Sequence, residues 1–246
     1  MVAFRTMGTK SQDRSVRLWR MLLGLTVLLI GGSLYEIFFV APTEEQMGIV
    51  QKIFYFHVPS AYAMYVGFLV SAIGSAAYLK TRKETWDAIG VAGAEVGVLF
   101  CAMVLTSGPL WARKAWGVWW TWDPRLTTTL LAGMVFVAYL ALRPSRGAGT
   151  TEKRFAAGLA ILGLLNVPII HYSVQRWRGQ HPTVISNRGG GLSPDMYPAL
   201  YMSFFAFTAL VALLIWTRVR VEKTKQRVGE LELRAARAGH LEEEEW

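Results

Sequence analysis

The sequence predicts an all-α, polytopic membrane protein with six transmembrane helices, both termini in the cytoplasm and a short tryptophan-rich helix on the outer face. Three features carry this prediction: six apolar runs, an uneven distribution of Lys and Arg between the connections, and a dense group of tryptophans. A helix needs about 20 predominantly apolar residues to cross about 30 Å of hydrocarbon. The chain has 246 residues, 53% of them apolar, and the repeated runs of that length exclude one or two soluble domains.

The six predicted spans follow one another along almost the whole chain. They lie at residues 21–40, 54–79, 88–105, 126–142, 155–170 and 196–216. The fourth and fifth are short, so we expect them to stand nearly upright or to extend into the interface. The first run is too long for a removable signal peptide and no small-residue cleavage site follows it, so it should remain as the first span. Residues 1–217 are thus predicted to form the membrane domain, and 218–246 a charged cytoplasmic tail.

The basic residues are divided unevenly between alternate connections. Of the 26 Lys and Arg, 19 fall in the two tails and in the connections after the second and fourth runs, and seven fall in the other three connections. Cytoplasmic connections carry the excess of Lys and Arg, so both termini are predicted to be cytoplasmic and the tryptophan-rich segment to be outside. The net charge of +9 is therefore a signal of topology in a lipid membrane and does not indicate a nucleic-acid partner.

The segment between the third and fourth runs, residues 116–127, reads WGVWWTWDPRLT. It contains an i, i+3, i+4, i+7 set, which predicts a helical turn with these side chains on one face. That set consists of Trp116, Trp119, Trp120 and Asp123. Asp is a favoured N-cap and proline a favoured first helical residue, so Asp123 should cap the fourth span. Together with Trp122, the indoles could form a platform for a planar ligand, or an aromatic belt at headgroup depth.

Three of the four histidines fall on the predicted outer side. His57 lies at the start of the second run, His171 closes the fifth run, and His181 lies in the third outer connection. Neutral imidazole is a common ligand of haem iron, and two of them on opposite sides give a six-coordinate centre. None of the three lies mid-membrane, where a transmembrane b-type cytochrome would place its histidines. The pattern favours haem at the outer face, while a headgroup or loop contact is the alternative for any single one of them.

For several other residues, the sequence is compatible with two different roles. Glu95 lies in the third run within a Gly-x-x-x-Gly frame; an intramembrane acid is a candidate site residue, but the glycines favour a role in close helix packing. Cys101, the one cysteine, is expected to be lipid-facing or packed, and without a Cys-x-x-Cys-His motif the chain is not itself a c-type cytochrome. Several outer arginines could bind ligand carboxylates or headgroup phosphates: Arg125, Arg176, Arg178 and Arg188.

Three of these motifs together resemble a known family. Residues 116–127 are similar to the WWD motif of haem-handling membrane proteins in cytochrome c biogenesis. Residues 54–61, FYFHVPSA, and residues 166–182 are similar to the first histidine motif and the last outer loop of those proteins. Within that group, a short six-span chain resembles the cytochrome c maturation protein C family, also called haem exporter protein C. The resemblance covers roughly residues 18–216.

The resemblance implies a site at the outer face of the bacterial cytoplasmic (inner) membrane. It implies that haem b is held there with His57 and His181 as the axial ligands of the iron, and that His171 ranks third. The tryptophan surface would cover the macrocycle, with Asp123 at its end and basic residues near the propionates. Trp177 and Arg178 would contact the ligand from the last loop, although the family usually has a tryptophan pair where this chain has Arg176 and Trp177.

The resemblance also implies partners and a function. The chain would deliver haem to a haem chaperone, maturation protein E. It would do so in a complex with the two ABC transporter subunits, maturation proteins A and B, and with a small membrane subunit, maturation protein D. This makes it a binding and transfer subunit rather than an enzyme. One alternative is a haem lyase that attaches haem to apocytochrome thiols, although such relatives are longer chains. Another is a small-solute transporter, which would need broken helices that meet at the midplane.

Overall fold

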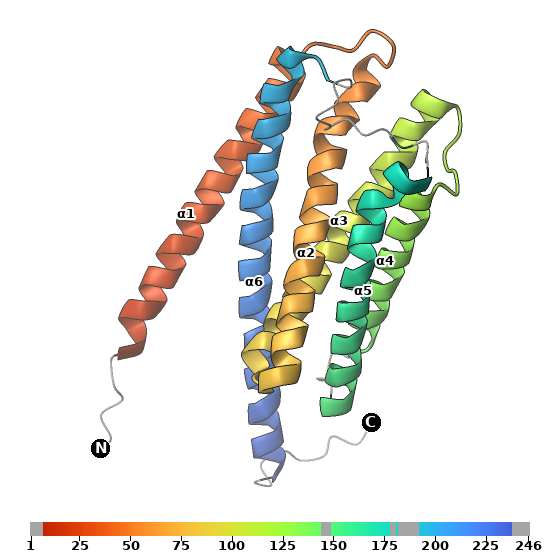
Figure 1. Ribbon diagram of the computed structural model, residues 1–246. Helices are drawn as coiled ribbons and strands as arrows, with labels where there is room; N and C mark the ends of the chain where they lie inside the picture. The colour runs from red at the N-terminus through yellow and green to blue at the C-terminus, as the bar shows by residue number, and fades with distance from the viewer. Residues whose placement is uncertain (1–6, 144–148, 178–180, 182–191, 238–246) are drawn as a thin grey trace, which may run out of the picture.

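The computed structural model describes residues 7–143, 149–177, 181 and 192–237 (Figure 1). No strand occurs within these ranges, and all six long helices are long and apolar enough to cross a membrane. The long helices are α1 (Met7–Tyr35), α2 (Phe54–Thr81), α3 (Glu84–Trp116), α4 (Pro124–Ala141), α5 (Thr150–Trp177) and α6 (Tyr197–Arg237). The predicted all-α class with six spans is therefore confirmed.

Several helices differ from the predicted spans at their ends. α3 ends at Trp116, well beyond the predicted end at residue 105, because the charges of its last turns do not interrupt its backbone hydrogen bonds. α5 runs through Pro168 without a break. α6 also continues across the predicted domain boundary after residue 217. Three short helices join the long ones: η1 (Glu36–Val40), η2 (Ile49–Ile53) and η3 (Pro194–Met196).

The helices form a bundle in which α1 and α6 lie on one side, α2 and α3 in the middle, and α4 and α5 on the other (Figure 1). The side chains of Trp19 and Thr217, and those of Ser33 and Ser203, join α1 to α6 through hydrogen bonds of 2.9 Å. α1 begins and α6 ends at the same end of the bundle, which we call the tail end. The opposite end, where α2 begins and α3 ends, is the pocket end.

Glycines hold α2 and α3 close together along the middle of the bundle. A Cβ atom on Gly93 would lie 2.5 Å from the backbone nitrogen of Ser71, and one on Gly67 would lie 2.5 Å from the backbone nitrogen of Gly97. Only glycine permits this approach, which is how small residues let membrane helices pack. The packing role predicted for the glycines around Glu95 is confirmed, and the side chain of Glu95 itself pairs with Arg218 of α6.

The core that α2 and α3 share with α4 is aromatic. The rings of Phe68 and Phe136 stack with centroids 3.9 Å apart and an angle of 3° between their planes. Cys101 is buried against this core. Of the two expected environments for its thiol, the packed one is therefore the one observed.

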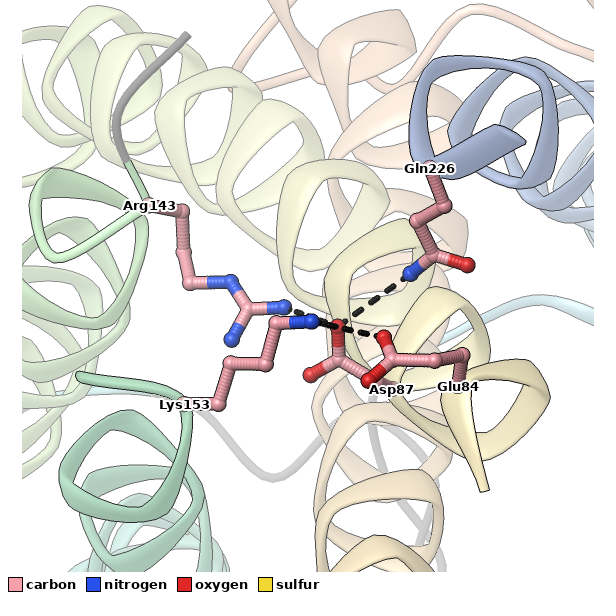
Figure 2. Close-up of polar contacts among 5 residues, drawn as sticks. All are labelled: Glu84, Asp87, Arg143, Lys153 and Gln226. Atoms are coloured by element: carbon pink, nitrogen blue, oxygen red, sulfur yellow. Dashed lines mark hydrogen bonds and ion pairs between the residues drawn. The ribbon is translucent and has the colours of Figure 1, made fainter. Parts of the chain in front are cut away.

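A group of charged and polar side chains meets near the tail end (Figure 2). Asp87 of α3 is 3% exposed and forms an ion pair with Arg143, just after α4. Lys153 of α5 lies 2.6 Å from the carboxylate of Glu84 and 3.9 Å from that of Asp87. Gln226 of α6 donates a hydrogen bond of 3.3 Å to Asp87. This tail-end cluster, Glu84, Asp87, Arg143, Lys153 and Gln226, thus ties α3 to three other parts of the bundle, one of which belongs to the predicted tail.

Candidate functional site

A cavity of about 440 Å³ lies at the pocket end, between the first turns of α2 and α4 and the last turns of α3 and α5. Small-molecule and cofactor sites fall within about 300–1,000 Å³ and combine an apolar lining with a few placed polar groups. This cavity has both properties. The lining residues on which the following argument depends are His57, Trp111, Trp116, Trp120, Arg125 and His181.

Two histidines from distant parts of the chain meet in this cavity. His57 lies in the first turn of α2, and His181 lies in the connection between α5 and α6. Their ring centroids are 6.3 Å apart, with an angle of 29° between the ring planes. The indole of Trp116, the last residue of α3, packs edge-on to His181 with centroids 6.5 Å apart. The structure therefore brings together the two residues that were predicted to act as a pair.

The start of α4 is formed as the sequence predicts. Asp123 has an extended backbone, and its carboxylate accepts a hydrogen bond of 2.9 Å from the backbone N–H of Arg125. Pro124 occupies the first turn, where a residue without an N–H costs nothing. The predicted N-cap is confirmed, and it fixes the position from which the Arg125 side chain leaves the helix.

Arg125 connects α4 to α5 and to His181. Its Nε donates to the carbonyl of Ile170 at 3.3 Å, and one terminal nitrogen donates to the carbonyl of His171 at 3.0 Å. The other terminal nitrogen lies 3.2 Å from Nδ1 of His181. A guanidinium can only donate, so this ring nitrogen accepts and the neutral ring carries its proton on Nε2. Arg125 thus holds the last turns of α5 and the ring of His181 beside the cavity.

The predicted interfacial helix over the tryptophan segment is wrong. α3 takes Trp116 into its last turn and ends at Gly117, whose φ of +76° lies in the left-handed region that glycine tolerates best. Arg113 stabilises this end, since its guanidinium donates to the carbonyl of Gly117 and lies 6.0 Å from the ring centre of Trp119. The residues from there to Asp123 form no helix.

The tryptophans therefore do not share one face. Trp116 and Trp120 line the cavity, whereas Trp119 is 56% exposed and Trp122 is 75% exposed. Trp122 packs edge-on to Trp120, with centroids 5.8 Å apart. The i, i+3, i+4 spacing applies only to a helix, and the irregular backbone after Gly117 turns alternate indoles outward. Two of the four suit a ligand platform, and two suit contact with lipid or with another protein.

Sequence reasoning missed the part of the cavity wall that α3 provides. Trp111 lines the cavity and packs edge-on to Trp116, with centroids 5.6 Å apart. Val104, Gly108 and Ala112 also line it, at the spacing of one helical face. This signal was present in the sequence, but the predicted third span ended at residue 105 and included only Val104 of this face.

The remaining candidate residues have different outcomes. His171 lines the cavity, and its ring packs edge-on to Tyr172 with centroids 5.1 Å apart. Trp177, the last residue of α5, is 61% exposed and is not part of the cavity lining. Arg176 is exposed beside it. Arg178 and Arg188 lie outside the described residues.

One polar atom of the cavity wall is not matched. Nε1 of Trp120 is buried and has no hydrogen-bond partner within the part of the chain that the structure describes. A buried donor without a partner costs about 1–3 kcal/mol, so an acceptor that reached this N–H would stabilise it. The two imidazoles, the indoles and the guanidinium that line the cavity together fit a flat aromatic metal complex that carries carboxylates.

A family sequence model and individual relatives with the same description match this chain. The sequence model of the family described as "Heme exporter protein C" matches residues 5–234. The protein of that name from Bradyrhizobium diazoefficiens is 34% identical over 214 residues, which cover 86% of this chain and 81% of the relative. The one from Escherichia coli strain K12 is 31% identical over 224 residues, which cover 89% of this chain and 90% of the relative.

Proposed function

The chain belongs to the haem exporter protein C family, and from this premise we propose that it binds haem b in the cavity at the pocket end and delivers it to a haem chaperone. Membership implies a role in haem handling for cytochrome c biogenesis. The six spanning helices and the bacterial relatives identify a multi-pass protein of the inner membrane.

The facing pair of His57 and His181 is the observation that carries this proposal. Haem iron takes axial ligands on the two sides of the macrocycle, and histidine is a common ligand. Both rings are already anchored by a neighbour: Nδ1 of His57 lies 2.8 Å from Oγ of Ser107, and Nδ1 of His181 lies 3.2 Å from Arg125. An acceptor beside the second ring nitrogen, such as Ser107 beside His57, orients the ring of a metal-binding histidine. Arg125 is a donor, so His181 must leave this bond before one of its ring nitrogens can bind the iron. In our proposal these two residues are the axial ligands, and His171, at the rim of the cavity, does not bind the iron.

The walls of the cavity supply the other contacts that haem needs. Trp111, Trp116 and Trp120 present aromatic surface to the macrocycle, an arrangement that buries a large apolar area. We assign the propionates to Arg125, because a charged donor binds carboxylates strongly. Asp123 acts indirectly, since its cap holds the first turn of α4 from which Arg125 projects.

The direction of delivery follows from the distribution of basic residues. The tail end carries the excess of Lys and Arg, so we place it in the cytoplasm and the pocket end on the outer face. Exposed Trp119 and Trp122 lie beside the cavity on that face, where we propose that the chaperone, maturation protein E, docks to take haem. The proposed membrane partners are the ABC transporter formed by maturation proteins A and B, and the small maturation protein D.

Haem binding by purified protein tests the proposal. The wild-type chain, isolated in detergent and supplied with haem, should show the absorption spectrum of six-coordinate, bis-histidine haem. His57→Ala and His181→Ala should each lose haem or change that spectrum, because each removes one axial ligand. His171→Ala, a matched control at the cavity rim, should keep the wild-type spectrum. Unchanged spectra in both ligand variants would overturn the assignment, and failure of the wild-type chain to bind haem would overturn the function.

A further inference from the structure

The imidazole of His57 is bound to α3 through one ring nitrogen only. Its Nδ1 lies 2.8 Å from Oγ of Ser107. The same hydroxyl lies 2.6 Å from the carbonyl oxygen of Met103, one turn earlier on α3. A carbonyl only accepts hydrogen bonds, so the single proton of the Ser107 hydroxyl goes to Met103. The hydroxyl oxygen must then accept from His57, and the neutral ring carries its proton on Nδ1.

This arrangement decides which nitrogen of His57 remains for a metal. With the proton on Nδ1, the lone pair of the neutral ring is on Nε2, which points to nearly the opposite side of the ring. Histidines that bind metals usually donate their second N–H to an acceptor of the protein, which fixes the tautomer and raises the basicity of the ligand nitrogen. Ser107 provides such an acceptor before any ligand is bound.

The neighbouring glycine supports the same position of the ring. A Cβ atom on Gly108 would lie 3.2 Å from Cε1 of His57, which is tighter than ordinary contact. The imidazole therefore lies directly against the backbone of α3, and a side chain at this position would push it away. Ser107 fixes the proton of the ring, and Gly108 leaves the space that the ring occupies.

The second histidine is held in the opposite way. Arg125 donates to Nδ1 of His181, so the proton of that neutral ring lies on Nε2. The two imidazoles thus differ before a ligand arrives: the lone pair of His57 lies on its Nε2, while the Nε2 of His181 carries a proton. The difference comes from the two anchors, one acceptor and one donor, and not from the rings.

We propose that Ser107 is a positioning residue for His57, which holds the imidazole in the Nδ1–H tautomer and so makes His57 the axial ligand that is prepared before haem enters. This inference rests on the proposed function, because it names the residue that prepares one of the two ligands. The hydroxyl of Ser107, which belongs to α3, would thereby strengthen the bond between His57 and the iron.

Three variants of α3 test this role in the full-length protein. Ser107→Ala removes the acceptor and should weaken haem binding about tenfold, the lower limit of the usual effect of losing such a partner. Its haem should also have a more positive midpoint potential, because a less basic ligand stabilises ferric iron less. Ser107→Thr keeps the hydroxyl and should retain both wild-type values. Thr106→Ala is the matched control, since the Thr106 hydroxyl bonds only to carbonyls of its own helix.

The outcomes separate this inference from the proposed function. If wild-type protein binds haem and His57→Ala loses it, but Ser107→Ala keeps the wild-type affinity and potential, the role of Ser107 is wrong and the function stands. If Ser107→Ala does not fold, Gly108→Ala provides the second measurement, because its new Cβ should displace the ring and alter the spectrum with the hydroxyl intact. A wild-type spectrum in Gly108→Ala would then contradict the proposed position of the His57 ring against α3.

Discussion

The two ends of the bundle use polar side chains for different purposes. At the tail end, Asp87 is 3% exposed and is enclosed by Arg143, Lys153 and Gln226, so that its charge is matched from three directions (Figure 2). At the pocket end, the polar side chains of His57, Arg125 and His181 border a cavity of about 440 Å³. Charged groups that pair with one another fix helices, whereas polar groups that border a cavity are available to a ligand.

This difference indicates that one end of the bundle stabilises the fold and the other end binds the ligand. The tail-end cluster and the glycine contacts of α2 and α3 hold the helices in fixed positions. The pocket end can then keep a cavity open and hold side chains around it, because the helices that bear them are anchored elsewhere. A change at the tail end should therefore affect the stability of the fold, and a change at the pocket end should affect the ligand.

The largest effect is expected for Asp87→Asn at the tail end. This change leaves the largely buried guanidinium of Arg143 without its carboxylate, and breaking a buried pair in this way costs about 3–5 kcal/mol. Thermal unfolding of the detergent-purified protein should show a strongly lowered Tm, while protein that stays folded keeps the wild-type haem spectrum.

Glu84→Gln is the control for that change. Glu84 belongs to the same cluster and pairs with Lys153, but its side chain is 43% exposed at the very start of α3, and exposed pairs contribute about 0–1 kcal/mol. A Tm for Asp87→Asn as high as that for Glu84→Gln would show that the buried carboxylate does not anchor the bundle.

A smaller effect is expected for Arg125→Lys at the pocket end. Lysine keeps the charge but loses the planar fork that reaches two carbonyls and His181. Haem affinity should fall about tenfold, equivalent to about 1.4 kcal/mol, with little change in Tm. Arg176→Lys, an exposed change at the same end, should leave the affinity as it is. Equal affinities in both variants would mean that Arg125 does not contact the ligand.

The smallest effect is expected for Trp120→Phe. It removes an N–H that is buried beside the cavity and keeps an aromatic ring, so the loss should not exceed one hydrogen bond, about 1 kcal/mol, or roughly fivefold in haem affinity. Trp119→Phe is the matched control, because Trp119 is exposed and does not line the cavity. Titration of the two variants with haem compares them directly. A larger loss in Trp119→Phe would reverse our assignment of the two indoles.

Local patterns in the sequence predicted the parts of the fold that local physics decides. Apolar length predicted six spans, and the Asp123–Pro124 step predicted the cap of α4, since both depend on neighbours along the chain. Residue type and the common side of the membrane left three histidines as candidates, and the family resemblance singled out residues 57 and 181. The structure places the rings of these two 6.3 Å apart.

Features that depend on tertiary contacts were not predictable in this way. Arg113 and Lys114 lie beyond the predicted third span, yet α3 continues through them. The helical spacing of the tryptophans was broken by the left-handed turn at Gly117. Asp87 was not singled out at all, because its partners come from α5, from α6 and from just beyond α4. Whether a charged side chain is buried and paired depends on the other helices that pack around it, so the sequence near Asp87 does not reveal it.

Chemical rescue of the two histidines tests the central claim most directly. His57→Gly and His181→Gly each remove one imidazole from the cavity wall, and added imidazole can occupy the vacated position as a free ligand of the iron. We predict that each variant, supplied with haem, lacks the bis-histidine spectrum and regains it on addition of imidazole, whereas the wild-type spectrum does not change. A bis-histidine spectrum in both glycine variants without imidazole would contradict the account.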